Sequence, residues 1–266
     1  MGKLNYLSKL YLVFVFIILY VPIGYLMFFS FNSGDSMAHF ESFSFKHYVS
    51  LFQDQRLLLI VLNTIIIALL SATIATVIGV FGAIMIMFMR NRSLKKSTLF
   101  LNNILIVSPD VIIGASFLLL FTMIGIKLGF TSVLLSHIAF SIPIVVIMVL
   151  PKLQEMSPTL IDAAIDLGAS KKEVLKRVII PYIQPSIFAG FFLALTYSLD
   201  DFAVTFFVTG NGFSTLSVEV YSMARTGVSL TINALSSVLF LIIMTLVIGY
   251  YIVRKQSMKF FSGVSK

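Results

Sequence analysis

The chain of 266 residues contains no cysteine and few charged side chains. The lack of cysteine excludes disulfides, thiolate chemistry and Cys-ligated metals. Charged residues make up 11% of the chain and hydrophobic residues 59%. A soluble domain of this length needs far more polar residues to cover its surface. The composition therefore indicates a membrane protein.

Motifs for nucleotide hydrolysis and metal binding are also missing. The phosphate-binding pattern G-x-x-x-x-G-K-[ST] does not occur, so we do not expect this chain to hydrolyse ATP. Gly210-Asn211-Gly212 lacks the lysine of that pattern and is interpreted as an external turn. His39, His47 and His137 are scattered without the spacing of a zinc site. We expect no catalytic residue, no metal ion and no cofactor in this chain.

Six apolar runs are long enough to cross a bilayer, which takes about 20 residues per helix. None has the alternating polarity of a membrane barrel strand. We therefore predict an all-α membrane protein with six transmembrane helices in one domain, residues 1–266. The first run is too long for a signal peptide and no small-x-small cleavage site follows it, so we expect a retained helix. The runs are residues 10–31, 57–89, 98–124, 131–151, 185–208 and 231–253.

The basic residues predict the orientation in the membrane. With both termini cytoplasmic, 15 of the 19 lysines and arginines lie inside and 4 outside, as the positive-inside rule requires. This bias accounts for the net charge of +8 without a nucleic-acid partner. The inside set is Lys3, Lys9, Arg90, Arg92, Lys95, Lys96, Lys152, Lys171, Lys172, Lys176, Arg177, Arg254, Lys255, Lys259 and Lys266, and the outside set is Lys46, Arg56, Lys127 and Arg225.

The acidic residues are distributed differently. Four of the 11 lie in the inside segments, so 7 remain for the outer segments and the spans, against 4 basic residues there. An outer face and interior that lean acidic favour a cationic solute.

The predicted cytoplasmic loop at residues 152–184 contains two short helices. Ser157-Pro158 provides an N-cap and a proline at the first helical position, and Gly168 ends this helix. Ser170-Lys171-Lys172-Glu173 is a capping box that opens the second helix, which we expect Pro181 to end.

Two roles fit this helix–glycine–helix unit on its pattern alone. Its basic residues suit an amphipathic pair lying on the inner leaflet. The small side chains of Ala163 and Ala164 instead favour a docking surface, because they let another protein approach closely and supply little area for membrane binding.

The same loop resembles the EAA loop of the binding-protein-dependent ABC importer permeases. That pattern is Glu-Ala-Ala, three residues, Gly, nine residues and Ile-x-Leu-Pro, and the spacing here matches at every step. The departures are conservative, with Asp for Glu, Val for Ile and Ile for Leu. The matching residues are Asp162, Ala163, Ala164, Gly168, Val178, Ile180 and Pro181.

Further segments between about residues 60 and 245 are similar to the polyamine branch of these permeases, the spermidine/putrescine permeases and specifically their second membrane subunit. The segments are Ser108–Gly114, Ser136–Ile138, Tyr197–Asp201, Phe207–Gly210, Tyr221–Val228 and Asn233–Leu235.

The resemblance implies the type I ABC importer permease fold and a set of partners. A sister permease would complete the pathway as a heterodimer. A dimer of ABC ATPase subunits would use the ATP, and an extracytoplasmic binding protein would deliver the polyamine. The EAA loop would be the segment that couples the permease to the ATPase. An ABC permease for another solute shares this loop and stays open as an alternative; an autonomous secondary transporter would need no ATPase dock.

Three carboxylates are the candidate substrate contacts. Asp200 and Asp201 lie in the middle of the fifth run, where a charged side chain costs about 2.5–3.5 kcal/mol. Because neighbouring positions on a helix diverge by about 100°, both cannot point into one pore unless the helix is wide-facing or broken there, and we expect one to line the pathway and the other to bond a neighbouring helix. Tyr197 offers an aromatic face for a cation. Asp110 follows Pro109 and either opens toward a cavity or makes a structural bond at a kink.

His137, beside Ser136 in the fourth run, is the one histidine within a predicted span. We predict that it hydrogen-bonds a neighbouring helix, with a proton relay as the less favoured role.

Overall fold

The computed structural model describes residues 6–226 and 229–263, and these ranges are helical apart from loops and one isolated bridge between Asn32 and Phe43. Lys3, Lys266 and the pair Gly227–Val228 lie outside the described residues. The chain divides into two compact units, Met1–Leu58 with Val220–Lys266, and Leu59–Glu219.

Four helices are long and apolar enough to cross a membrane, and a bent pair of helices counts as a fifth if it forms one span. The prediction of an all-helical membrane protein is therefore confirmed. The four helices are α1 (Tyr6–Phe29), α3 (Gln55–Phe88), α6 (Phe130–Glu155) and α9 (Ile180–Asp200). The last of these is continuous with the short helices that precede it.

In the first unit, α12 (Leu230–Gly263) packs against α1 and α2 (Lys46–Gln53). The loop between α1 and α2 folds around Asn32, whose amide donates to the carbonyl oxygens of Ser36 and His39 at 3.0 and 2.9 Å. Two hydrogen bonds from one buried amide fix the loop without regular secondary structure.

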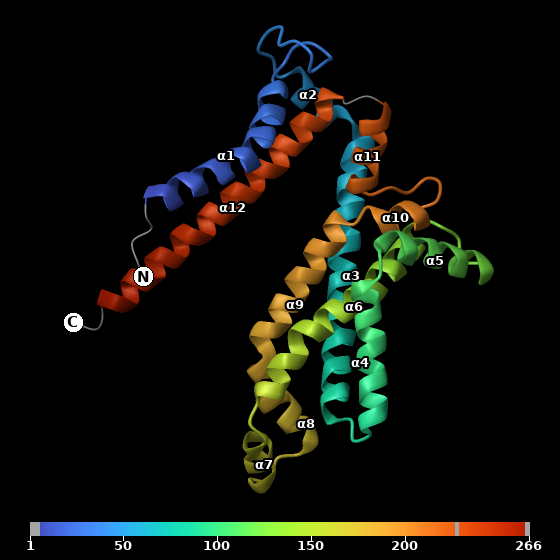
Figure 1. Ribbon diagram of the computed structural model, residues 1–266, viewed down its shortest axis with the longest axis vertical. Coiled ribbons are helices and arrows are strands. Elements are labelled where there is room, and N and C mark those ends of the chain that lie inside the picture. The colour runs from blue at the N-terminus through green and yellow to red at the C-terminus, as the bar shows by residue number, and fades with distance from the viewer. Residues whose placement is uncertain (1–5, 227–228, 264–266) are drawn as a thin grey trace. The chain divides into compact units, whose positions relative to one another are not determined.

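The second unit is built on α6, which packs along α9 (Figure 1). Gly79 of α3 and Gly190 of α9 both face Val145 of α6, and a Cβ added at Gly79 would lie 2.7 Å from the Val145 Cβ. Small residues let helix backbones approach closely within a membrane, where no hydrophobic force drives helices together. The three helices therefore form a tight core.

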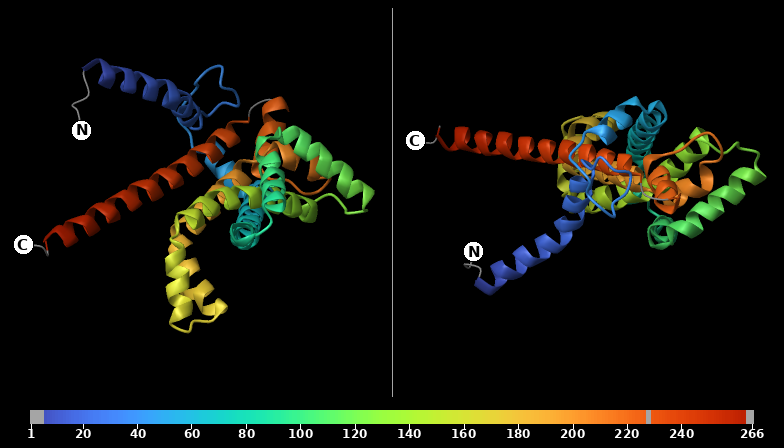
Figure 2. Two further views of the ribbon diagram at one scale, coloured as in Figure 1. Left: turned by 60° about the horizontal axis from the view of Figure 1, so that its bottom comes forward. Right: turned by 90° about the horizontal axis from the view of Figure 1, so that it is seen from above.

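The run at residues 98–124 is not one straight helix. It divides into α4 (Arg92–Val107) and α5 (Asp110–Met123), bent by 107° (Figure 1, Figure 2). Pro109 explains the bend, because a proline forces the residue before it into an extended conformation and cannot donate a helical hydrogen bond. α5 packs against α10 (Ala203–Val208), and Gly114 leaves no room there for a side chain, since an added Cβ would lie 3.0 Å from the Val204 Cα.

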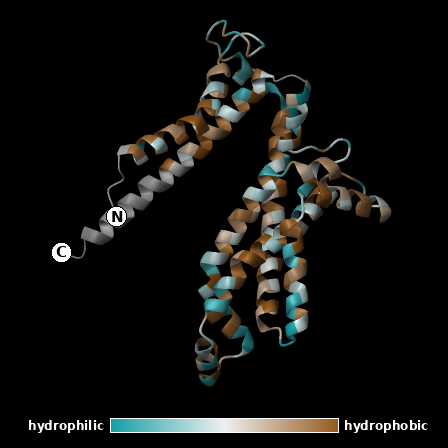
Figure 3. Cartoon of the chain, viewed as in Figure 1, coloured by the Kyte–Doolittle hydropathy of each residue, from teal (hydrophilic) through white to brown (hydrophobic). Residues whose placement is uncertain are grey.

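The predicted helix–glycine–helix unit forms α7 (Pro158–Asp166) and α8 (Lys171–Val174). The prediction that Pro181 ends the second helix is wrong. A five-residue π-turn (Leu175–Ile179) leads directly into α9, and Pro181 lies in the first turn of α9. The helix is continuous from Lys171 to Asp200, so Pro181 lies within it, directly after the π-turn that interrupts the regular hydrogen bonding. Figure 3 shows hydrophilic residues at α7 and α8 and mainly hydrophobic ones along α6.

Candidate functional site

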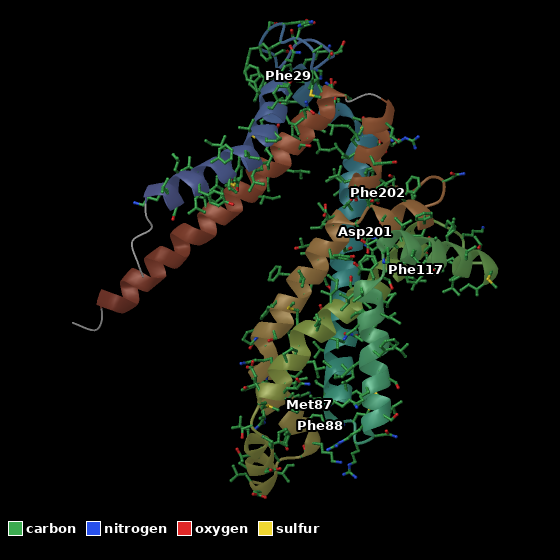
Figure 4. All side chains as sticks on the ribbon, viewed as in Figure 1. Phe29, Met87, Phe88, Phe117, Asp201 and Phe202 are labelled. Atoms are coloured by element: carbon green, nitrogen blue, oxygen red, sulfur yellow. The ribbon has the colours of Figure 1, made fainter. Side chains whose placement is uncertain are left out.

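A buried polar site of the second unit lies at a break between α9 and α10. The run at residues 185–208 is not one helix, because α9 ends at Asp200 and α10 begins at Ala203, so the helix is broken at the two aspartates. Figure 4 labels Asp201 at this junction. Its carboxylate accepts hydrogen bonds from the backbone N–H groups of Val204 and Thr205 at 3.3 and 2.8 Å. These bonds satisfy free N–H groups at the start of α10 and thereby stabilise the break.

His137 joins this junction to the core. It comes from α6, is fully buried, and bonds the Ser198 Oγ through Nδ1 at 2.6 Å and the Thr205 Oγ1 through Nε2 at 2.8 Å. Ser198 in turn lies 3.0 Å from the Ser71 Oγ of α3. The network therefore connects α3, α6, α9 and α10, and the prediction of a histidine that bonds neighbouring helices is confirmed.

The donors in this network follow from the Asp201 carboxylate, which can only accept. Thr205 uses its hydroxyl proton to donate to the Asp201 Oδ2 at 2.7 Å. The His137 Nε2 must then donate to Thr205, and for a neutral ring the Nδ1 accepts from Ser198. Every ring nitrogen and both hydroxyls are satisfied in this arrangement, which rigidifies a buried polar network.

Asp200 differs from its neighbour in its surroundings. Its side chain is exposed, and it has no hydrogen bond or ion pair within the described ranges, whereas Asp201 is 8% exposed. Tyr197, one turn earlier on the same side of α9, is 39% exposed and donates its hydroxyl proton to the Asp110 Oδ1 at 2.8 Å. The structure thus brings Tyr197 and Asp110 together and separates the two adjacent aspartates.

A cavity of about 220 Å³ lies next to the Tyr197–Asp110 pair. The side chains around it come from α4, α5, α6 and α9, and Tyr197 is the polar one among them. Its ring meets Phe140 edge to face, with centroids 5.2 Å apart. The lining residues are Leu105, Ile106, Ile113, Phe140, Ile144, Ile147, Leu193 and Tyr197.

The helix–glycine–helix unit has the caps that its sequence predicts. Gly168 adopts φ +84°, and its N–H donates to the Ile165 carbonyl at 2.8 Å, which ends α7. Ser170 and Glu173 bond each other's backbone N–H groups, which confirms the capping box.

α7 has no buried side chain, and Leu167, directly after it, is 90% exposed. The predicted coupling residues divide between the two faces of the segment. Asp162, Ala163, Gly168 and Pro181 are exposed, and Ala164, Val178 and Ile180 are partly buried.

Sequence reasoning missed the hydroxyl partners of His137. Ser71 and Thr205 lie within apolar stretches, Ser198 lies in the more polar stretch at residues 196–201, and small polar residues are commonly used for hydrogen bonds between helices. Their residue type is the available signal, but their pairing depends on three-dimensional packing. No group of three or more His, Asp or Glu side chains that could hold a metal ion occurs in the part of the chain that the structure describes.

Comparisons with known proteins agree on one family. Residues 75–257 match the model of the binding-protein-dependent transport system inner membrane component. The chain is 36% identical over 245 residues to the spermidine/putrescine transport system permease protein PotC of Escherichia coli strain K12, with 92% of each chain covered. It is 33% identical over 231 residues to the putrescine transport system permease protein PotI of the same strain, covering 84% of this chain and 82% of that protein.

A solved structure shares the fold. A chain of the bacterial alginate ABC transporter, in complex with an alginate pentasaccharide-bound periplasmic protein, superposes with a TM-score of 0.68. The match covers 90% of this chain and 91% of that chain at 18% identity. The family model matches more than half of the chain, the sequence relatives cover most of it, and its helical architecture agrees. This chain belongs to the family of binding-protein-dependent transport system inner membrane components.

Proposed function

We propose that this chain is the permease subunit of an ATP-driven importer that takes up polyamines such as spermidine and putrescine. The observation that carries the substrate class is the 36% identity to PotC over nearly the whole of both chains. The Asp110–Tyr197 pair beside an apolar cavity, with Asp200 exposed on the same side of α9, fits a cation with an aliphatic body.

The proposed topology is a single domain with six spans in the type I importer permease fold. α1, α3, α6 and α9 are four of them, the bent pair of α4 and α5 is another, and α12 is the sixth. Both termini and the segment at residues 152–184 then lie on the cytoplasmic side of the cell membrane, in agreement with the bias of basic residues.

The proposed coupling element is the α7–α8 unit with the π-turn and the start of α9 that follow it. Its matched residues are Asp162, Ala163, Ala164, Gly168, Val178, Ile180 and Pro181. Its exposed apolar side chains, Leu160, Ile165 and Leu167, have room to enter a groove on an ATPase subunit. Partly buried residues of this unit pack against the hydrophobic cluster that contains Leu153 and Ile183, so a movement of α7 would be transmitted to α6 and α9.

The proposed partners are a sister permease that forms the other half of the pathway, a dimer of ABC ATPase subunits and an extracytoplasmic polyamine-binding protein. ATP is used by the ATPase subunits, and this chain needs no cofactor of its own. The pathway residues are Asp110, Tyr197 and Asp200, and Asp201 stabilises the adjacent helix break through its hydrogen bonds to α10.

Reconstitution tests this function. The chain is assembled with its sister permease and ATPase subunits in proteoliposomes, and uptake of labelled spermidine and putrescine is measured with loaded binding protein. We expect uptake that requires both ATP and the binding protein. Uptake without the ATPase would identify an autonomous carrier, and ATP hydrolysis stimulated by another loaded solute but not by polyamines would reject the substrate class.

A further inference from the structure

Two of the helices that line the apolar cavity between α4, α5, α6 and α9 carry a carboxylate about one turn from a lining residue. On α9, Leu193 and Tyr197 line the cavity and Asp200 follows one turn later. Residues four and three positions apart share one face of a helix. On α5, Asp110 precedes the lining residue Ile113 by three positions, so it lies on the cavity face as well. Both helices thus present an apolar side chain to the cavity and a carboxylate one turn away.

These carboxylates have capacity left for a cation. Asp110 accepts one hydrogen bond, from Tyr197, and within the described ranges no lysine or arginine pairs with Asp110 or Asp200. Asp201 is different, because its two oxygens accept from Val204 and Thr205 and it is buried. The free negative charge therefore lies at Asp110 and Asp200.

The combination selects one chemical class of occupant. A small hydrated cation would leave the aliphatic walls unused, and a lipid chain would leave the carboxylates unpaired. A linear diamine or triamine matches both parts, since an ammonium group pairs with carboxylates while the methylene groups lie against apolar and aromatic side chains.

We propose that this cavity holds a methylene segment of the transported polyamine, with an ammonium group between Asp110 and Asp200, and that its size sets which chain lengths are transported. This proposal rests on the proposed function and adds a selectivity step within the membrane subunit. The residues that set the length are lining residues away from the carboxylate turns, Ile144 and Ile147 of α6 and Leu193 of α9, which is two turns before Asp200.

Two variants change the cavity in opposite directions. Leu193→Ala enlarges it, and Ile147→Phe fills it. Leu199→Ala is the matched control, because Leu199 is on the same helix, is 40% exposed against 42% for Leu193, and does not line the cavity.

The assay is ATP-dependent uptake of α,ω-diamines with three to six methylene groups by the complete transporter in proteoliposomes. Each diamine is supplied on saturated binding protein, and the series is limited to those that calorimetry shows the binding protein to carry, so that delivery does not set the preference. The readout is the number of diamines transported per ATP hydrolysed.

A single methylene group in a hydrophobic pocket changes discrimination by about 10-fold or more. We therefore expect Leu193→Ala to raise the ratio of the longest to the shortest carried diamine by about 10-fold. Ile147→Phe should lower that ratio, and Leu199→Ala should leave it unchanged. Variants that change the rates for all diamines by the same factor, or not at all, would overturn the proposal, since the cavity would then be filled by lipid or by a neighbouring helix. Failure of the proposed function itself looks different, because the unmodified transporter would then move no diamine.

Discussion

Replacing His137 with leucine tests the buried network at the α9–α10 break. The change removes the hydrogen bonds of both ring nitrogens, to Ser198 at 2.6 Å and to Thr205 at 2.8 Å, at a fully buried position. Ser198 keeps Ser71 as a partner and Thr205 keeps Asp201, so neither hydroxyl is left alone. At about 0.5–1.5 kcal/mol for each net hydrogen bond, the free energy of unfolding should fall by about 1–3 kcal/mol.

Unfolding of the purified subunit by SDS in mixed micelles measures this change. The chain has no tryptophan, so the loss of helix is followed by circular dichroism. Ser136→Ala is the matched control, since Ser136 is also buried on α6 but donates only to Ser132 of its own helix, at 2.8 Å. The control should change stability much less. If His137→Leu is as stable as Ser136→Ala, the network does not stabilise the break and the reasoning fails.

Two further predictions concern the segment at residues 152–184, for which we propose a cytoplasmic location. Gly168→Val places a β-branched residue at φ +84°, a left-handed conformation that costs about 1–2 kcal/mol for a residue with a Cβ, so polyamine uptake should fall while ATP hydrolysis continues. Gly168→Asn is the control, because asparagine tolerates this conformation, and it should keep most of the uptake. Equal uptake by both variants would contradict the role of the turn. Lys171→Cys introduces a single cysteine, because the chain has no other. This cysteine should not react with an impermeant thiol reagent in intact cells and should react after permeabilisation. Labelling in intact cells would reverse the proposed orientation.

Much of the helical architecture can be predicted from the sequence. Long apolar runs give α1, α3 and α6 because a membrane leaves no alternative to intrahelical hydrogen bonding. The ends of α7 and the start of α8 follow from local capping, with Gly168 at a positive φ and the Ser170–Glu173 box both formed. These features depend on residues that are close in sequence.

The functional site is harder to predict because its contacts are distant in sequence. By hydropathy, residues 185–208 form one run. In the structure, the carboxylate of Asp201 accepts a hydrogen bond from the start of the next helix, and this run is broken at that point. The proline at position 109 signals an interruption but does not give the size of the bend. Tyr197 and Asp110, 87 positions apart, meet only through packing.

The most direct test of the account is polyamine uptake by Asp200→Asn and Asp201→Asn variants, compared at equal amounts of assembled transporter. Each change removes a charge and keeps the size of the side chain. We predict that Asp200→Asn assembles with unchanged stability and loses most spermidine uptake, because an exposed carboxylate facing the cation is gone. Asp201→Asn should instead lower stability, because the NH2 group of its amide would face N–H and O–H groups from which the carboxylate accepts hydrogen bonds. Wild-type uptake by Asp200→Asn would contradict the assignment of this residue to the pathway.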